Sequence, residues 1–316
     1  MIKLSFSTLT CIAALLVACV LVGCGGASST VDPLVPTRVI AFGDAYSAVN
    51  PATGAGTFTV QTGDTDNTLA GRIAAQYGFV LNGTTTSGGY SYAVGTLGNG
   101  KVDNVVTQIT TYLGNVGNSI GAKDLIIITV GSQDIYSAAS TNNTSAISTA
   151  ASNLISSIQR LTSAGAKYIL VVLPINMART PWGLSGVDAT SSTVQALSYD
   201  TGTQCLSFSC QLSTKLNTAY PATSSHQPIL LADLMSYSNM FTGTGVGLEN
   251  TYLNYGVTNP NTAACNAGGT SGCVTSAVNA NYATYVFADT LNLTPFANRL
   301  LADYIYNYNF YRAGWR

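Results

Sequence analysis

Two apolar runs, each ending in a glycine-containing polar turn, constrain the fold of this 316-residue chain more than any other feature. Residues 39–42 lead into Gly43-Asp44-Ala45, and residues 125–130 lead into Gly131-Ser132-Gln133-Asp134. Uninterrupted apolar runs of this kind predict strands that are covered on both faces, as in a parallel sheet. Ligands bind such sheets beyond the carboxyl ends of the strands. The residues after each run are therefore the first candidates for a functional site.

Segments with helical spacing of apolar residues separate the expected strands. Helices are predicted over residues 67–77, 102–113, 147–164, 191–197, 212–220 and 294–306, and strands over residues 38–42, 79–81, 124–130, 168–173, 229–231 and 284–287. Residues 236–283 are expected to form a long polar excursion, and the aromatic residues after Tyr306 an extended tail. The alternation predicts an α/β fold with a parallel sheet of about five strands and helices on both faces. No linker divides residues 38–316, so we expect one domain.

The composition restricts the class of protein. Charged residues make up only 8% of the chain, against about 25% in an average globular protein. The formal net charge is −1 and basic residues do not cluster, which argues against a nucleic-acid partner. A surface covered by Ser, Thr, Asn, Gln, Tyr and Gly is typical of exported bacterial proteins.

The first residues have the features of an export signal. Lys3 precedes an apolar stretch over residues 9–22, too short for an ordinary membrane span, which ends at Gly23-Cys24. This resembles a bacterial lipoprotein signal, with residues 1–23 removed, Cys24 lipidated and residues 24–37 forming a flexible tether. Gly25 after the cysteine fits anchoring in the outer membrane of the cell envelope. A plain secretory signal with a chance cysteine is the alternative.

Four cysteines remain after residue 24: Cys205, Cys210, Cys265 and Cys273. An even number in an exported chain predicts two disulfides. Three pairings are open, and local closure, Cys205 to Cys210 and Cys265 to Cys273, is the simplest. A metal site is less well supported because the spacing lacks Cys-x-x-Cys and the single histidine, His226, has no evident partner. We expect no metal and no cofactor.

The residues after the strands resemble the sequence blocks of the GDSL, or SGNH, hydrolases, a family of esterases and lipases. The matching segments, in chain order, are Gly43-Asp44-Ala45, Tyr92-Ala93-Val94-Gly95, Gly131-Ser132-Gln133-Asp134 and Asp289-Thr290-Leu291-Asn292. Arg179-Thr180-Pro181 and the segment from Arg299 to Asp303 look like the lipase branch. The resemblance implies a flavodoxin-like SGNH fold over residues 38–306.

The departures from the family pattern bear on activity. The family's nucleophilic serine falls on Ala45, its general-base histidine on Asn292 and its oxyanion-hole asparagine on Gln133. Only Gly95, a backbone donor, and Asp289, which orients the histidine, match the family. A methyl group cannot form an acyl-enzyme, and a neutral amide is not a useful base. The resemblance thus implies the fold of an esterase without its Ser–His machinery.

Other residues could in principle replace the lost groups. Ser47, Ser132 and His226 carry suitable side chains, but we expect Ser47 to point elsewhere, Ser132 to lack a base close in sequence and His226 to lie at the opposite end of the sheet. A carboxylate mechanism through Asp44, Asp134 or Asp289 is a further alternative. The simpler interpretation is that these carboxylates hydrogen-bond turn amides.

Three hypotheses follow for the function. The preferred one is a lipid-anchored pseudoenzyme that binds a small ester, lipid or glycan in the old crevice, or an envelope protein. The others are an ester hydrolase with non-standard residues and a structural surface lipoprotein. A tyrosine-rich C-terminal strip either contacts a ligand or covers the domain's own apolar surface, and the second is the simpler expectation.

Overall fold

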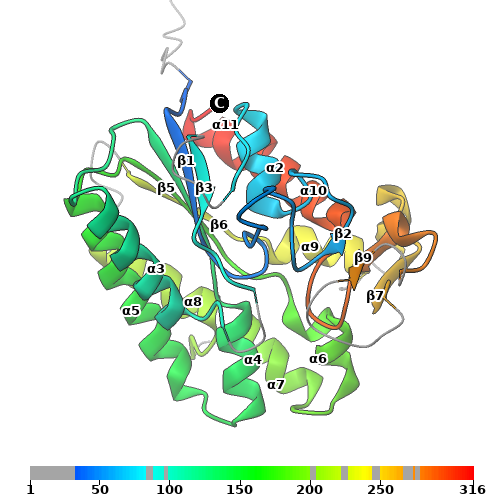
Figure 1. Ribbon diagram of the computed structural model, residues 1–316. Helices are drawn as coiled ribbons and strands as arrows, with labels where there is room; N and C mark the ends of the chain where they lie inside the picture. The colour runs from blue at the N-terminus through cyan, green and yellow to red at the C-terminus, as the bar shows by residue number, and fades with distance from the viewer. Residues whose placement is uncertain are drawn as a thin grey trace, which may run out of the picture. The chain divides into compact units, whose positions relative to one another are not determined.

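The computed structural model describes residues 33–82, 88–95, 99–199, 204–221, 227–243, 250–265, 273–274 and 278–316. Leu34–Arg316 forms one compact unit around a parallel five-stranded sheet with helices on both sides (Figure 1). The sheet order is β3-β1-β4-β5-β6. Its strands are β1 (Arg38–Gly43), β3 (Gly89–Ser91), β4 (Asp124–Thr129), β5 (Tyr168–Val172) and β6 (Ile229–Ala232). The α/β, SGNH-like fold expected from the sequence is confirmed.

The two apolar runs occupy the middle of the sheet. β1 pairs with β4 in register, from Arg38 opposite Asp124 to Gly43 opposite Thr129. Every residue of β4 is buried, which explains why its sequence does not alternate between apolar and polar positions. At the start of the two strands, the Arg38 guanidinium forms an ion pair with the buried Asp124 carboxylate.

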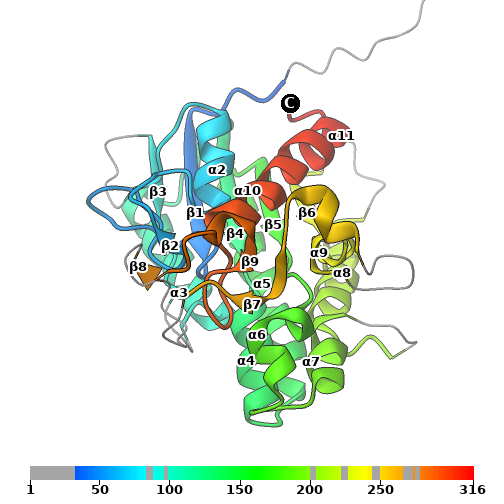
Figure 2. The ribbon, with the colours of Figure 1, turned by 90° about the vertical axis from the view of Figure 1, so that its right-hand side faces the viewer.

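Helices cover both faces of this sheet. One layer contains α3, α5 and α8, and the other contains α2, α9 and α10 (Figures 1 and 2). The helices are α2 (Leu69–Gln76), α3 (Val102–Asn115), α4 (Ser132–Ser140), α5 (Ser145–Ser163), α6 (Pro181–Ser185), α7 (Ser191–Ser198), α8 (Phe208–Ala219), α9 (Met235–Thr242), α10 (Pro295–Tyr304) and α11 (Tyr311–Ala313). Among the described residues, none of the helices is long and apolar enough to cross a membrane.

The remaining elements are short. They are β2 (Val60–Gln61), β7 (Asn259–Ala263), β8 (Cys273–Val274), β9 (Tyr285–Phe287), η1 (Met177–Arg179), η2 (Thr251–Tyr255), η4 (Tyr282–Thr284) and the π-helical η5 (Ile305–Phe310). The predicted excursion over residues 236–283 therefore contains most of α9 and several short elements. Neither α4 nor α6 was expected, because residues that follow strands were assigned to turns.

One strand prediction was wrong, and one predicted strand forms outside the main sheet. The segment at Tyr285–Phe287 is a strand, but it pairs with β7 and lies outside the main sheet. The fifth strand of the main sheet is β3, where glycines hid the pattern. The predicted strand over residues 79–81 does not form, and its neighbour Asn82 makes only an isolated bridge to Tyr90.

The predicted extended tail was also wrong. The chain continues from α10 into a π-helical turn, η5, and then into α11. Ile305 and Phe310 are both fully buried and lie five residues apart, which matches the i→i+5 hydrogen-bond pattern of a π-helix. The burial of these two side chains therefore accounts for a helical segment, although the tyrosines in it, spaced two residues apart, suggested an extended chain.

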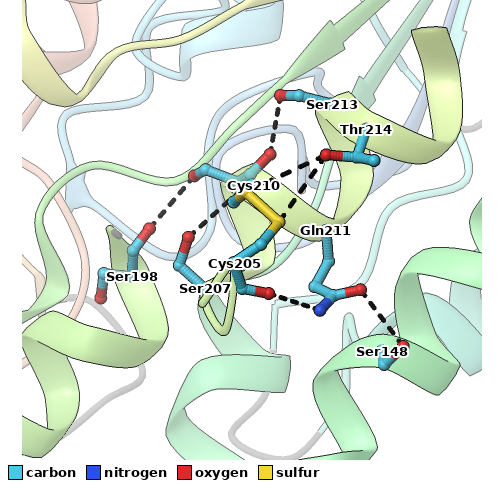
Figure 3. The surroundings of a disulfide bond; sticks show 9 residues. Ser148, Ser198, Cys205, Ser207, Cys210, Gln211, Ser213 and Thr214 are labelled. Carbon is cyan, nitrogen blue, oxygen red and sulfur yellow. Dashed lines mark hydrogen bonds between the residues drawn. A yellow bond between two sulfur atoms is a disulfide. The ribbon is translucent and has the colours of Figure 1, made fainter. Parts of the chain in front are cut away.

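Both disulfides close locally, as the simplest pairing predicted. Cys205 bonds to Cys210 with Cα atoms 5.3 Å apart, and Cys265 bonds to Cys273 with Cα atoms 6.0 Å apart. Figure 3 shows the first of these, where the Gln211 amide donates a hydrogen bond to the Cys205 carbonyl. The Ser207 hydroxyl caps the start of α8 beside this disulfide. Cys24 and His226 lie outside the described residues.

Candidate functional site

The first three sequence blocks meet at the carboxyl end of the sheet. The Val94 amide donates to the Gly43 carbonyl at 3.1 Å, which aligns the second block with the first. The Asp44 amide donates to the Thr129 carbonyl at 3.1 Å, which joins the first block to the end of β4. Gly43 has a φ of +130°, and a Cβ there would lie 1.8 Å from the Thr129 carbonyl oxygen. The tight turn that presents Ala45 therefore requires glycine before it.

Asp44 forms a buried hydrogen-bond cluster at this turn. One carboxylate oxygen accepts from the Tyr46 amide at 3.1 Å, and the other accepts from the Ser132 hydroxyl. Burial raises the pKa of Asp44 above its ordinary value, although the hydrogen bond from Ser132 lowers it in part. Ser132 has no base close to it in sequence, but Asp44, 88 residues away, reaches it through the pairing of β1 and β4.

Ser47 takes no position from which it could replace the nucleophile. Its hydroxyl is fully buried and shares a 2.8 Å hydrogen bond with the Thr129 hydroxyl. Its carbonyl accepts from the Ser91 hydroxyl at 2.7 Å. Ser47 therefore joins β1, β3 and β4 below the turn, and it points away from Ala45 as expected.

The fourth block forms its own tight turn after β9. The Asp289 carboxylate accepts from the backbone amides of Leu291 and Asn292, at 2.9 and 2.7 Å. Its second oxygen accepts from the Asn292 side-chain amide at 2.8 Å. Asp289 and Asn292 are 1% and 3% exposed. Asn292 thus makes the contact to the carboxylate that the family resemblance assigns to a histidine, while offering no group that can accept a proton.

Tyr46 connects the first block to the fourth. Its hydroxyl is buried and has no hydrogen-bond partner among the described residues. Burial, followed by the negative charges of Asp44 and Asp289, raises the pKa of this phenol well above its ordinary value. The ring therefore lies within electrostatic reach of both carboxylates, and the phenol stays neutral.

The positions expected to carry the chemistry are buried. Ala45 is 4% exposed and Gln133 is 3% exposed. Gly95 is also buried, and a Cβ added to it would lie 2.2 Å from a ring carbon of Phe58, so this ring lies directly against the glycine. Phe58 lies two residues before β2, and no sequence signal marked it.

Gln108 is a second residue that the motifs did not reveal. Its side-chain amide accepts from the Gly43 amide at 2.8 Å and donates to the Gly43 carbonyl at 3.2 Å. Gln108 therefore fixes the turn before Ala45 from helix α3. Its position in the sequence could have indicated this role. Gln108 lies on the apolar face of a predicted amphipathic helix, where a buried polar side chain needs a hydrogen-bond partner.

A polar cavity of about 310 Å³ lies beside the third block, between α3, α4 and the start of α5. Asp134 and Asp103 contribute carboxylates, Lys101 an ammonium group, and Asn143 and Asn153 side-chain amides. Asp134 accepts hydrogen bonds from the Val102 amide at the start of α3. Burial raises the pKa of Asp134 to about 7. The lining includes Asp134 of the third block but neither Ala45 nor Asn292.

No curated protein matches the chain. Among solved structures, the crystal structure of an acetyl xylan esterase is similar, with 15% sequence identity, a TM-score of 0.46 and coverage of 85% of this chain and 98% of that one. The family model of the GDSL-like lipase/acylhydrolases matches residues 39–305, a span that contains all four blocks. The chain therefore belongs to the family of GDSL-like lipases and acylhydrolases.

Proposed function

We propose that this protein is an exported, lipid-anchored GDSL-family pseudoenzyme that acts by binding and not by ester hydrolysis. The observation that carries the proposal is the pair of side chains at Ala45 and Asn292. Neither can attack an ester or accept the proton of a nucleophile. Removal of either partner in a serine-protease site costs on the order of 10⁶-fold in rate, and loss of both adds little more.

The buried turn at Asp289 supports this proposal. In a working triad the carboxylate holds a histidine in place for proton transfer. Here Asp289 binds Asn292 and two backbone amides, so its hydrogen bonds stabilise the loop. Gln133 carries its amide one methylene further out than asparagine, which displaces the remaining oxyanion donor. A shift of about 1 Å can cost on the order of 10²-fold.

The polar cavity beside Asp134 is where we place the binding function. Its volume of about 310 Å³ lies at the lower end of the range for small-molecule sites, about 300–1,000 Å³. Apart from two alanines, its lining consists of hydroxyl, amide, carboxylate and ammonium side chains, which suits a small polyhydroxylated ligand such as a sugar unit better than an acyl chain. A glycan component of the envelope is therefore the ligand class we favour.

Ser132 gives the second candidate function, an ester hydrolase with non-standard residues. Its hydroxyl donates to Asp44, a carboxylate whose pKa is raised by burial, and a serine bound to a carboxylate base is a conceivable nucleophile. Ser132 is 6% exposed, so a substrate carbonyl has little access to it. We therefore rank this candidate second.

The deciding experiment is hydrolysis of p-nitrophenyl acetate and a longer p-nitrophenyl ester by the parent and by Ser132→Ala. No turnover above buffer is expected from either protein. Turnover that Ser132→Ala abolishes would replace the pseudoenzyme proposal with the second candidate, and turnover lost in Ser47→Ala or His226→Ala would assign it to those residues. Incorporation of labelled fatty acid into the parent but not into Cys24→Ser would test the anchor separately.

A further inference from the structure

Charge is unevenly distributed between the two ends of the sheet. At the amino end, exposed cations are supplied by Lys123 directly before β4, Lys167 directly before β5, and Arg312 and Arg316 after η5. The Trp315 ring contacts Tyr168, the first residue of β5, with centroids 5.2 Å apart, which places this C-terminal segment at the amino end. In Figures 1 and 2, α11 lies at the same end of the sheet as the point where the chain enters β1.

The described acidic side chains at this end are already paired. Asp124 is fully buried and forms an ion pair with Arg38. Asp303, at the end of α10, forms an ion pair with Arg72. Most other described carboxylates lie at the carboxyl end, after strands or in the first turns of helices: Asp44, Asp103, Asp134, Asp233 and Asp289. Among the described residues, cations therefore outnumber carboxylates at the amino end, although the formal net charge of the chain is −1.

Exposed apolar and aromatic groups accompany the cations. Tyr311 and Val35 are each 69% exposed, and Tyr308 is 45% exposed. Arg312 lies over the Tyr308 ring at 5.2 Å from its centroid, and Tyr304 stacks on that ring at 5.1 Å. The Tyr308 ring already contacts the Tyr304 ring and the Arg312 guanidinium group, so it is poorly placed to stack on a sugar. Tyrosine is enriched where proteins meet lipid headgroups, and lysine and arginine are attracted to anionic headgroups.

We infer that this amino-end face, defined by Lys123, Lys167, Tyr311, Arg312 and Arg316, docks against an anionic phospholipid surface. The inference deepens the proposed function, because it rests on the envelope location proposed there. Thr37, which precedes β1, donates its amide to the Lys123 carbonyl at 3.1 Å, so the chain enters the domain at this face. Cys24 lies ten residues before Leu34, a distance of at most about 35 Å when fully extended.

This orientation has a consequence for the binding site. A lipid at Cys24 would hold the domain close to the bilayer, and the basic face would then set which side contacts it. The polar cavity and the four sequence blocks lie at the carboxyl end of the sheet, so they would face away from the membrane. Attraction of cations to an anionic surface falls off within a Debye length, about 8 Å at physiological salt, so the face must lie close to the headgroups.

The test is cosedimentation of the Leu34–Arg316 unit with vesicles, because this unit holds all the described core and carries no leader. Binding is expected to vesicles of phosphatidylcholine mixed with phosphatidylglycerol, to weaken in high salt, and to be absent from phosphatidylcholine alone. Arg316→Gln should weaken binding about fivefold, and Arg312→Gln with Arg316→Gln about 25-fold, from the usual contribution of one cation at such a surface.

The matched control is Arg299→Gln, which removes an exposed cation from the first half of α10 and should leave vesicle binding unchanged. Lys123→Gln with Lys167→Gln tests the same face without altering the C-terminal segment, and should also weaken binding about 25-fold. Equal binding to both vesicle types, no binding to the anionic vesicles, or equal weakening by Arg299→Gln and Arg316→Gln would overturn the inference. Because this unit lacks Cys24, the result is independent of whether that residue is lipidated or any ester is hydrolysed.

Discussion

The Asn292 side-chain amide donates a 2.8 Å hydrogen bond to the carboxylate of Asp289, and both residues are almost completely buried. Asparagine preserves the donor that the family resemblance assigns to histidine at this position, so the loop keeps its internal hydrogen bonds. It does not preserve the second ring nitrogen, which in a histidine would accept the proton of the nucleophile. The substitution therefore maintains the structure of the turn while removing its chemistry.

The same relationship predicts that substitutions can raise the rate of ester hydrolysis. In Asn292→His, the Nδ1–H group can replace the amide donor to Asp289, and Ala45→Ser supplies the hydroxyl. With Gln133→Asn added, hydrolysis of p-nitrophenyl acetate should rise about 10²-fold above the parent, the lower range for a positioned acid–base group. Ala45→Ser alone is the control and should remain at the parent rate. A folded triple variant without any gain would show that these positions do not converge as the family resemblance requires.

Tyr46→Phe should leave the free energy of unfolding unchanged or raise it by about 1 kcal/mol, because it removes a buried hydroxyl without a hydrogen-bond partner among the described residues. Tyr77→Phe is the matched control. Tyr77 donates a 3.0 Å hydrogen bond to the Trp315 carbonyl, so its loss should lower stability by about 1 kcal/mol. Urea denaturation of both variants measures the difference. A loss of stability in Tyr46→Phe equal to that in Tyr77→Phe would show that the Tyr46 hydroxyl does form a hydrogen bond.

Asp134 should make stability depend on pH. Burial raises its folded-state pKa to about 7, above an unfolded value of about 3.9. The protonated carboxyl group therefore contributes to the free energy of unfolding. This contribution is fully present below about pH 4 and is lost as pH rises to about 7. Asp134→Asn keeps an acceptor for the Val102 amide but carries no charge, so it should exceed the parent in stability at pH 8, by up to a few kcal/mol, and match it at pH 4.

Thermal unfolding across this pH range provides the measurement for Asp134→Asn. The control is Asp64→Asn, which changes an exposed loop carboxylate. The gain in stability at pH 8 is expected for Asp134→Asn and not for this control. If Asp134→Asn were no more stable than the parent at pH 8, the Asp134 carboxylate would not be held in its neutral form by burial.

The two disulfides should differ in their reaction with a mild reductant. Cys265 and Cys273 are 7% and 8% exposed, whereas Cys205 and Cys210 are more accessible. Alkylation followed by mass spectrometry should therefore detect Cys205 and Cys210 first. Each loop is short, so replacement of either pair by serine should cost only about 2 kcal/mol of stability. Simultaneous labelling of all four cysteines would show that reduction requires global unfolding.

Local sequence patterns predicted most of the fold. The apolar runs within β1 and β4, residues 39–42 and 125–128, do not alternate with polar residues, which predicted strands covered on both faces. The caps of α10 are equally local: Thr294 accepts from the Ala297 amide at 3.2 Å and Pro295 occupies the first turn. By contrast, β3 contains glycine and serine, and its place in the sheet comes from pairing with β1.

What the sequence alone determined is which chemical groups are present: a methyl at position 45, an amide at position 292 and a carboxylate at position 289. These follow from residue identity once the order of the blocks suggests the family. Tertiary structure decided which groups touch. Ser132 meets Asp44 across 88 residues, and Gln108 holds Gly43 across 65, because parallel strand pairing brings distant segments to one edge. The gathering of cations at the amino end of the sheet was likewise decided by the fold, since Lys123, Lys167 and Arg312 are far apart along the chain.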